Sequence, residues 1–348
     1  MRIVVTGATG NAGTSVLSAL ARDPDVDEIV GVARRLGGWS NPRTRWVQAD
    51  IVTSPLEDVF AGADAVIHLA WAIQPSRDAA MLRAVNVDGS RRVFEAAARA
   101  GVGALVHASS VGVYSPGPDD RPVDESWPRD GIATSFYSRH KAEAERLLDA
   151  FEDRMRIVRL RPALIFKREA AAEIRRYFIG PLLPSPLVHP RLIPLLPLPD
   201  HLVLQAVHAH DVGEAYRLAA TRDDARGAYN IAADPVLDGA TLGRLLGARP
   251  LRLPARLVRA AADLSWRAGL QPTPPGWLDM GLAVPTLDSS RARAELGWTP
   301  RYDAGEALLE LLDGLRHSDG LPTPPLERHA GGRLRQREFP PGAARSAT

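Results

Sequence analysis

Short runs of β-branched and aliphatic residues alternate with longer stretches of helical spacing through the first half of the chain. Continuous apolar runs of this kind indicate strands that are buried on both faces. Their alternation with helices is typical of a parallel sheet that is covered by helices on both sides. The pattern predicts an α/β fold with a doubly wound parallel sheet. The expected strands are 2–6, 29–32, 45–47, 65–69, 104–109 and 156–160, and the expected helices are 12–22, 86–100 and 136–152.

The character of the sequence changes after Pro162. Residues 167–200 are rich in proline and large aliphatic side chains, whereas residues 206–232 again show a helix followed by a strand. Asp211 is expected to cap that helix, and Glu214 three residues later would complete a capping box. Further helices are expected near 254–268, 289–296 and 304–316.

These changes predict two domains and a tail. The large sheet domain would consist of residues 1–166 and 205–232, and a smaller C-terminal substrate-binding lobe would consist of 167–204 and 233–316. From about His317 the chain is rich in proline, glycine and arginine and has few periodic apolar residues. Residues 317–348 are therefore predicted to be a disordered tail.

Composition narrows the range of functions. The 43 basic and 41 acidic residues leave a net charge of only +2 and form no concentrated basic block, which argues against nucleic-acid binding. No apolar stretch approaches the roughly 20 residues that a membrane span needs. The absence of cysteine excludes disulfides and thiolate chemistry, and it fits a cytoplasmic location. Only Lys141 and Lys167 are lysines, so each lysine is informative.

A glycine-rich loop joins the first expected strand to the first expected helix. It reads Thr6-Gly7-Ala8-Thr9-Gly10-Asn11-Ala12-Gly13. In a dinucleotide-binding loop the first glycine makes a tight turn, the second lets the backbone approach a pyrophosphate, and the third lets the helix pack close to the strand. The N-terminus of the helix then offers free N–H groups to the phosphates. The strand before the loop and the helix after it therefore predict a Rossmann-type dinucleotide-binding site.

The end of the second strand bears on the choice between NAD and NADP. A carboxylate there would bind the ribose 2′-hydroxyl, whereas an arginine accommodates a 2′-phosphate. The sequence is Val32-Ala33-Arg34-Arg35, which contains no carboxylate. NADP is therefore the favoured cofactor, with Arg34 as its expected contact. The alternative is that Arg34 and Arg35 are solvated surface residues.

Tyr137 and Lys141 are four residues apart in an expected helix, so they share one face. A phenol with a pKa of about 10 is a poor base at neutral pH, and a neighbouring ammonium would lower that pKa. Ser109 and Ser110 close the fifth strand, at the edge of the sheet where ligands bind. A serine hydroxyl there could bond a substrate carbonyl, although both serines could instead bond their own backbone.

Together these motifs resemble the extended short-chain dehydrogenases/reductases, the NAD-dependent epimerase/dehydratase group. The resemblance runs from residue 1 to about residue 316 and includes further matches in the same order. These matches are Asp50-Ile51, His68-Leu69-Ala70, Asn86, Ser109 to Tyr114, Arg161-Pro162, His210-Asp211-Val212, Tyr229-Asn230-Ile231 and Leu296 to Pro300.

The resemblance implies a role for each matching residue. Ser110 would be the catalytic serine, supported by Ser109, and Tyr137 would be the proton donor or acceptor. Lys141 would bind the nicotinamide ribose and lower the pKa of Tyr137. The expected cofactor contacts are Gly7, Thr9, Gly10, Asn11, Ala12, Gly13, Arg34, Asp50, Ile51, Leu69, Ala70, Tyr137, Lys141 and Pro162.

Two segments depart from the family's pattern. Dehydratases of this group usually carry an Asp-Glu pair just after the catalytic hydroxyl residue, where this chain has Val111 and Gly112, so nucleotide-sugar dehydration is disfavoured. The family's Tyr-Gly-Pro after the sixth strand is Phe166-Lys167-Arg168 here. The position of the substrate therefore cannot be carried over.

A run of potential metal ligands, His208-Ala209-His210-Asp211, is better explained by the expected cap at Asp211 and by the family match. No metal is therefore expected.

The chain is expected to be an NAD(P)-dependent reductase or dehydrogenase that transfers hydride to or from a carbonyl or secondary alcohol. A nucleotide-sugar epimerase is the alternative enzyme, and a non-catalytic protein that senses NADP(H) is the alternative outside catalysis. A sensor would not need a tuned phenol, and the apolar segment 167–204 favours a less polar small-molecule substrate. The helices 86–100 and 136–152 correspond to the family's dimer-forming pair, so the resemblance also implies a homodimer.

Overall fold

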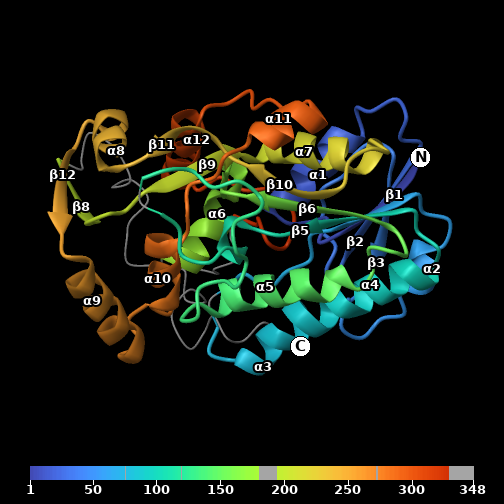
Figure 1. The fold of residues 1–348 in the computed structure, drawn as a ribbon, viewed down its shortest axis with the longest axis horizontal. Coiled ribbons are helices and arrows are strands. Elements are labelled where there is room, and N and C mark those ends of the chain that lie inside the picture. The colour runs from blue at the N-terminus through green and yellow to red at the C-terminus, as the bar shows by residue number, and fades with distance from the viewer. Residues whose placement is uncertain (75, 119, 180–193, 272, 329–348) are drawn as a thin grey trace.

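The computed structural model describes all residues except 75, 119, 180–193, 272 and 329–348. Its described part contains a large parallel sheet with helices on both faces and a smaller lobe at one end of the molecule (Figure 1).

Seven strands of the described residues form the large sheet. They are β1 (Arg2–Thr6), β2 (Glu28–Ala33), β3 (Thr44–Gln48), β4 (Ala65–His68), β5 (Ala104–Ala108), β6 (Arg156–Pro162) and β10 (Gly227–Ile231). Their spatial order is β10-β6-β5-β4-β1-β2-β3, and every neighbouring pair is parallel. The direction in which successive strands are added therefore reverses between β1 and β4.

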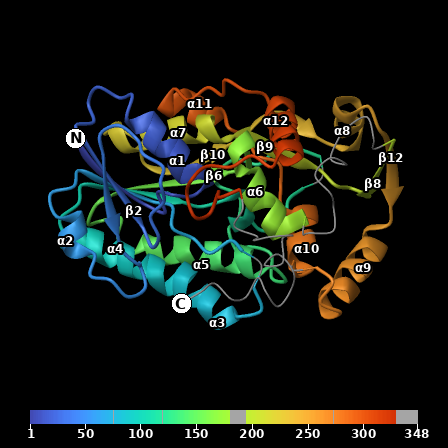
Figure 2. The same ribbon diagram turned by 180° about the vertical axis from the view of Figure 1, so that it is seen from behind.

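Helices cover the large sheet on both faces (Figures 1 and 2). One face carries α1 (Asn11–Leu20), α7 (Ala209–Thr221) and α11 (Ser290–Leu296), and the other carries α2 (Glu57–Phe60), α4 (Ser90–Arg99) and α5 (Phe136–Asp149). The short helix α3 (Ala79–Arg83) and a π-helical turn at Ala84–Gly89 lead into α4, and a 3-10 turn at Val111–Val113 follows β5.

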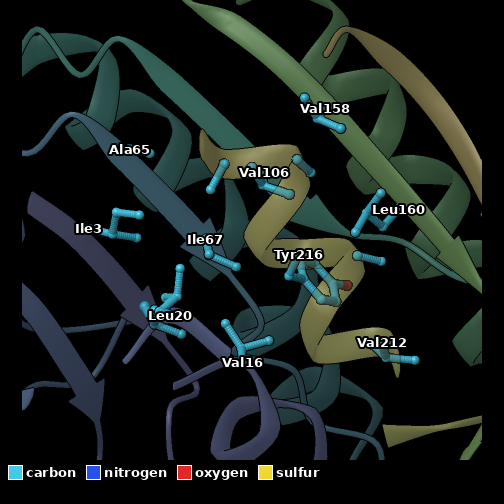
Figure 3. Close-up of a cluster of buried hydrophobic side chains, with 14 of the residues drawn as sticks. Ile3, Val16, Leu20, Ala65, Ile67, Val106, Val158, Leu160, Val212 and Tyr216 are labelled. Carbon is cyan, nitrogen blue, oxygen red and sulfur yellow. The ribbon is translucent and has the colours of Figure 1, made fainter. Parts of the chain in front are cut away.

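The apolar faces of these layers form the core. Tyr216 and Val212 of α7 and Val16 of α1 lie against strand residues such as Ile67 and Val106 (Figure 3). A second cluster fills the opposite face, between the sheet and α2, α4 and α5. Burial of apolar surface on both faces fixes the strand ends, and so positions the loops that follow β1, β4 and β5.

The smaller lobe contains two further sheets. Its strands are β7 (Leu164–Phe166), β8 (Leu195–Pro199), β9 (Leu204–His208), β11 (Ala233–Leu237) and β12 (Arg249–Leu253), in the orders β11-β9-β7 and β12-β8. Its helices are α6 (Ala171–Ile174), α8 (Gly239–Leu246), α9 (Ala255–Arg267), α10 (Gly276–Ala283) and α12 (Ala304–His317). A 3-10 turn at Arg168–Ala170 precedes α6, and a π-helical turn at Arg175–Ile179 follows it.

The predicted doubly wound parallel sheet is confirmed. The strands β7 and β9, which the predicted boundaries place with the large sheet, pair with each other in the lobe instead. Both strands are short, and the apolar pattern of a short strand does not show which sheet it joins. Helix α10 was not predicted from the sequence, and it supplies part of the site described below.

The predicted capping box at Asp211 and Glu214 is wrong. Helix α7 begins earlier, and its N-cap is His208, whose side chain accepts a hydrogen bond from the backbone N–H of His210. The carboxylate of Asp211 accepts one from the backbone N–H of Tyr302 at 3.1 Å instead. A contact between residues so far apart in the chain cannot be inferred from local spacing.

The predicted disorder of residues 317–348 does not hold for its first part. Helix α12 includes His317, and residues 318–328 pack back onto the protein. Leu326 is fully buried, and the carboxylate of Asp319 pairs with Arg168 and Arg328. One buried leucine and these ion pairs replace the periodic apolar face that the sequence lacks. Residues 329–348 lie outside the described residues.

Candidate active site

The glycine-rich loop lies where the strand order reverses, between the carboxyl ends of β1 and β4. Open parallel sheets bind ligands at such a point. Gly7 has a φ of +73°, and a Cβ there would lie 2.6 Å from the backbone nitrogen of Ala70 beyond β4. A Cβ on Gly13 would lie 2.4 Å from the carbonyl oxygen of Gly7. Both positions therefore require glycine, and α1 begins directly after Gly10, its N-cap.

A hollow of about 790 Å³, counted with its open mouth, begins at this loop. Arg34 and Arg35 lie exposed at its edge, just after β2, whereas Ile51 is buried in its wall. The position beside the loop and between two strand ends suits the adenosine half of a dinucleotide. Of the predicted cofactor contacts, the hollow brings together Gly7, Thr9, Arg34, Asp50, Ile51 and Ala70.

Sequence reasoning missed other residues of this hollow. Trp71 lines it and directly follows the predicted contact Ala70, so sequence adjacency could have identified it. Pro324 and Pro325 also line it. They come from the segment that was predicted to be disordered, and no local pattern in the sequence places them here.

The remaining predicted cofactor residues lie outside the wall of the hollow. Gly10 to Gly13 form the end of the loop and the first turn of α1, and Pro162 is buried at the end of β6. Leu69 follows β4, and its backbone N–H donates to the carbonyl of Thr6 at 3.0 Å. The side-chain oxygen of Asn11 is buried, and no described residue bonds it.

Three predicted catalytic residues come together at the carboxyl end of β5. The Ser110 hydroxyl oxygen accepts a hydrogen bond from the N–H of Gly112 at 3.0 Å, and the hydroxyls of Ser110 and Tyr137 are hydrogen bonded to each other. Tyr137 and Lys141 lie on successive turns of α5, and both side chains are buried. Ser135 is the N-cap of this helix, and its side chain accepts a hydrogen bond from the backbone N–H of Ser138 at 3.3 Å.

Burial controls the protonation of the pair on α5. It raises the pKa of Tyr137 to about 12, and the hydrogen bond with Ser110 offsets only part of this effect. Burial also lowers the pKa of Lys141 to about 7, against the opposing field of Glu145. The expectation that Lys141 lowers the pKa of Tyr137 is therefore not met in this structure, because burial is the main cause of the shift and raises the pKa. Tyr137 is a phenol, not a phenolate, at neutral pH.

The ammonium of Lys141 contacts a backbone carbonyl and an aromatic ring. It donates to the carbonyl of Ala108 at 2.5 Å and lies 3.6 Å from the centre of the Trp71 ring. The centre of the Tyr137 ring is farther away, at 5.7 Å. A cation held by one carbonyl and one aromatic face keeps donors free for a further acceptor.

Apolar side chains surround Tyr137. The Trp277 ring of α10 lies 4.9 Å from the Tyr137 ring between centroids, and the Trp71 ring lies 6.2 Å away. Phe178 contacts Trp277 edge-on at 5.1 Å, and Met280 of α10 packs in the same cluster. Sequence reasoning missed Trp277 and Met280, because a helix of eight residues between proline-rich segments gives a weak periodic pattern.

A buried polar network supports α5 from behind. The guanidinium of Arg161 on β6 donates to both carboxylate oxygens of Glu145, at 2.9 and 2.6 Å. It also donates to the hydroxyl of Tyr114 at 2.9 Å, and that hydroxyl donates to Asn230 at 2.6 Å. Bidentate pairs of this kind fix orientation as well as contributing energy. Glu145 lies one turn beyond Lys141, so the network holds the helix that carries the catalytic pair.

The histidine run at 208–211 has structural roles. His208 stacks on Tyr302 with ring centroids 3.9 Å apart and lies 3.1 Å from a carboxylate oxygen of Glu310. Among the described residues, no three histidine or carboxylate side chains are grouped as metal ligands. Within the residues that the structure describes, every helix is too short or too polar to cross a bilayer.

Comparison with known proteins identifies the family. The profile of the NAD dependent epimerase/dehydratase family matches residues 3–232. An uncharacterized protein of Mycobacterium tuberculosis is 25% identical over 325 residues, which are 92% of this chain and only 31% of that relative. The chain thus spans about a third of the length of that curated relative.

Two further likenesses cover nearly whole proteins. A 4-hydroxy-2-methyl-3-oxo-4-farnesyl-3,4-dihydroquinoline-1-oxide ketoreductase of Stigmatella aurantiaca is 28% identical, over 91% of this chain and 96% of that enzyme. The structure of MoeE5, solved with UDP-glucuronic acid and NAD, is 23% identical with a TM-score of 0.66, over 91% of this chain and 100% of that one. The chain belongs to the NAD dependent epimerase/dehydratase family, within the extended short-chain dehydrogenases/reductases.

The described residues fit the nicotinamide dinucleotide that this family binds. Gly7 and Gly13 leave room that a Cβ would fill, and the N–H groups of the first turn of α1 are free for a pyrophosphate. The buried oxygen of Asn11 still lacks a donor among the described residues. The adenosine end would lie in the hollow, and the nicotinamide end would lie toward Lys141 and Tyr137.

Proposed function

We propose that this protein is an NAD(P)-dependent oxidoreductase that transfers hydride between the nicotinamide and a carbonyl or secondary alcohol carbon. The observation that carries the proposal is the contact of Ser110 with Tyr137, with Lys141 on the next turn, at the end of the sheet that carries the dinucleotide loop. A protein that only sensed the cofactor would not need a hydrogen-bonded phenol at this position.

The protonation of Tyr137 favours carbonyl reduction at neutral pH. The reduced nicotinamide supplies the hydride when it is bound. As the carbonyl π bond breaks, Tyr137 donates its phenolic proton to the oxygen, and Ser110 holds that oxygen and stabilises the resulting phenolate by hydrogen bonding. Because burial raises the pKa of Tyr137 to about 12, the group is available as an acid. Lys141 would bind the ribose hydroxyls and, once protonated, stabilise the phenolate.

The surroundings of Tyr137 support a substrate of low polarity. Burial is the main cause of the raised pKa of Tyr137, and the hydrogen bond with Ser110 is the opposing one. Trp71, Trp277 and Met280 present rings and a thioether there. A nucleotide sugar needs cationic partners for its diphosphate. The ketoreductase relative acts on a farnesylated quinoline oxide, as its name states, whereas UDP-glucuronic acid bound to MoeE5 supports an epimerase as the second candidate.

The assay that tests the proposal follows NADPH absorbance with apolar ketones such as acetylnaphthalene and decalone. We expect stoichiometric oxidation of NADPH and formation of the secondary alcohol. In parallel, UDP-glucose and UDP-glucuronic acid are incubated with NAD, and epimers are separated chromatographically. Epimer formation without turnover of the ketones would favour the epimerase. Tight binding of NADPH without turnover of any carbonyl or nucleotide sugar would favour a sensor.

We also propose a homodimer formed through α4 and α5. These helices lie side by side on one face of the sheet (Figures 1 and 2) and correspond to the family's dimer-forming pair. Light scattering at micromolar concentration is expected to give twice the mass of one chain. A monomer at that concentration would contradict the assignment.

A further inference from the structure

Lys167 is buried at the amino end of α1. It follows β7, is 2% exposed, and donates three hydrogen bonds to that helix. The acceptors are the carbonyl of Asn11 at 2.9 Å and the hydroxyls of Thr14 and Ser15 at 2.7 and 3.2 Å. In a chain that uses arginine almost everywhere, this is one of only two lysines, and the other is Lys141.

This position is unfavourable for a cation in the protein alone. The amino end of a helix carries a partial positive charge, so it favours anions and opposes an ammonium. All three hydrogen-bond acceptors of Lys167 are neutral. Glu169, Glu173 and Glu310 act on Lys167 only through their fields, and burial outweighs them and lowers its pKa to about 8. The ammonium thus lacks a close anion among the described residues.

A dinucleotide would supply that anion. The pyrophosphate carries two negative charges and binds at the first turn of the helix that follows the glycine-rich loop. We propose that Lys167 is a positioning residue for this pyrophosphate. Lys167 fixes the first turn of α1 through its hydrogen bond to Asn11 and places a positive charge beside the bound dianion. The inference rests on the proposed cofactor binding, and it adds a residue that lies where the family carries the glycine of Tyr-Gly-Pro.

The proposal predicts that dinucleotide binding is coupled to proton uptake. Below about pH 8 Lys167 is already protonated in the free protein, so affinity is at its maximum. A bound dianion stabilises the ammonium and raises the pKa of Lys167. Affinity should therefore fall as pH rises above the free pKa, by up to about tenfold per pH unit, with uptake of up to one proton.

Other titrating groups must be separated from Lys167. His208 and His210 face it from the start of α7, but burial lowers the pKa of both, so they stay neutral above pH 8. Glu169, Glu173 and Glu310 face it from the turn after β7, from α6 and from α12. Burial raises the pKa of Glu173 to about 7, so Glu173 titrates at the lower end of the pH range and is mostly ionised near pH 8, where proton uptake is measured. Lys141, with a pKa of about 7, is the main competitor and needs its own variant.

The experiment compares Lys167→Met, which removes the charge, with Lys167→Gln, which removes the charge and keeps an N–H donor. Dissociation constants for NADPH and NADH are measured by fluorescence between about pH 7 and pH 9.5. Proton uptake is measured by calorimetry near pH 8 in two buffers of different ionisation enthalpy. Melting temperatures show that each variant is folded, and Lys141→Met is measured in the same way.

We expect both Lys167 variants to weaken NADPH and NADH about equally, by about tenfold at pH 7, because both cofactors carry the pyrophosphate. Proton uptake should shrink in both variants but persist in Lys141→Met. If Lys167→Gln binds like the wild type, or if proton uptake is unchanged, Lys167 is a structural anchor and the proposal is wrong. If the wild-type protein binds neither dinucleotide, the proposed function itself fails, which is a distinct result.

Discussion

Replacing Tyr137 by phenylalanine is expected to lower kcat for carbonyl reduction by about 10²- to 10⁴-fold, the usual contribution of a general acid. The dissociation constant for NADPH should stay within a few-fold. The substitution removes one hydroxyl and keeps the ring, so the packing against Trp277 at 4.9 Å and Trp71 at 6.2 Å is retained. Stopped-flow rates and fluorescence titrations measure the two quantities separately.

Tyr229→Phe is the matched control for this substitution. The hydroxyl of Tyr229 also donates to a side chain, Glu295 at 3.0 Å, but it lies on β10 away from α5. The control should lose some stability and keep kcat. If Tyr137→Phe retained the wild-type kcat on an identified substrate, Tyr137 would not be the acid. A large loss of NADPH affinity would instead indicate a role in binding.

The pH dependence of the reaction should follow from the same environment. The pKa of Tyr137 is about 12 because the phenol is buried, so the acid form persists through the neutral range. We therefore expect the pH dependence of reduction near neutral pH to come from Lys141, whose pKa burial lowers to about 7 in the absence of the cofactor. Burial thus raises the pKa of Tyr137 and lowers the pKa of Lys141, although the two residues share one face of α5.

The large sheet could be predicted from the sequence because its determinants are local. A strand buried on both faces must be apolar throughout. Position 7 must be glycine, because a Cβ there would lie 2.6 Å from the backbone nitrogen of Ala70. The i, i+4 spacing of Tyr137 and Lys141 is also local. Each of these requirements is visible within a few residues of the chain.

The parts that were missed depend on contacts between distant residues. Trp71 and Trp277 meet around Tyr137 only because α10 packs against α5. Pro324 and Pro325 reach the hollow beside the glycine-rich loop because residues 318–328 fold back, held by Asp319 and Leu326. Asp211 bonds the backbone of Tyr302 rather than its own helix. The hydrophobic periodicity of a segment does not indicate which distant segment will line the site.

We predict that cofactor choice depends on Arg34, an exposed side chain at the edge of the hollow. Arg34 follows the last residue of β2, beside Asp50 and Ala70, where a dinucleotide would place its adenosine ribose. A guanidinium can hold a 2′-phosphate through two parallel hydrogen bonds, whereas it gains little from a ribose diol. Charge-assisted contacts of this kind change affinity by roughly ten- to a hundredfold. We expect the wild-type protein to bind NADPH more tightly than NADH.

Arg34→Asp should lower NADPH affinity by at least tenfold and improve NADH affinity, because a carboxylate repels the 2′-phosphate and accepts hydrogen bonds from the diol. Arg35→Asp introduces the same charge change one residue later. Arg35 also lies exposed at the edge of the hollow, so Arg35→Asp is the matched control for a general effect of charge there. The ratio of the NADPH and NADH dissociation constants isolates the 2′-phosphate, since the rest of the two cofactors is identical. Equal or tighter binding of NADH by the wild-type protein would show that Arg34 is a solvated surface residue, and an equal change of the ratio in both variants would show a general effect of charge.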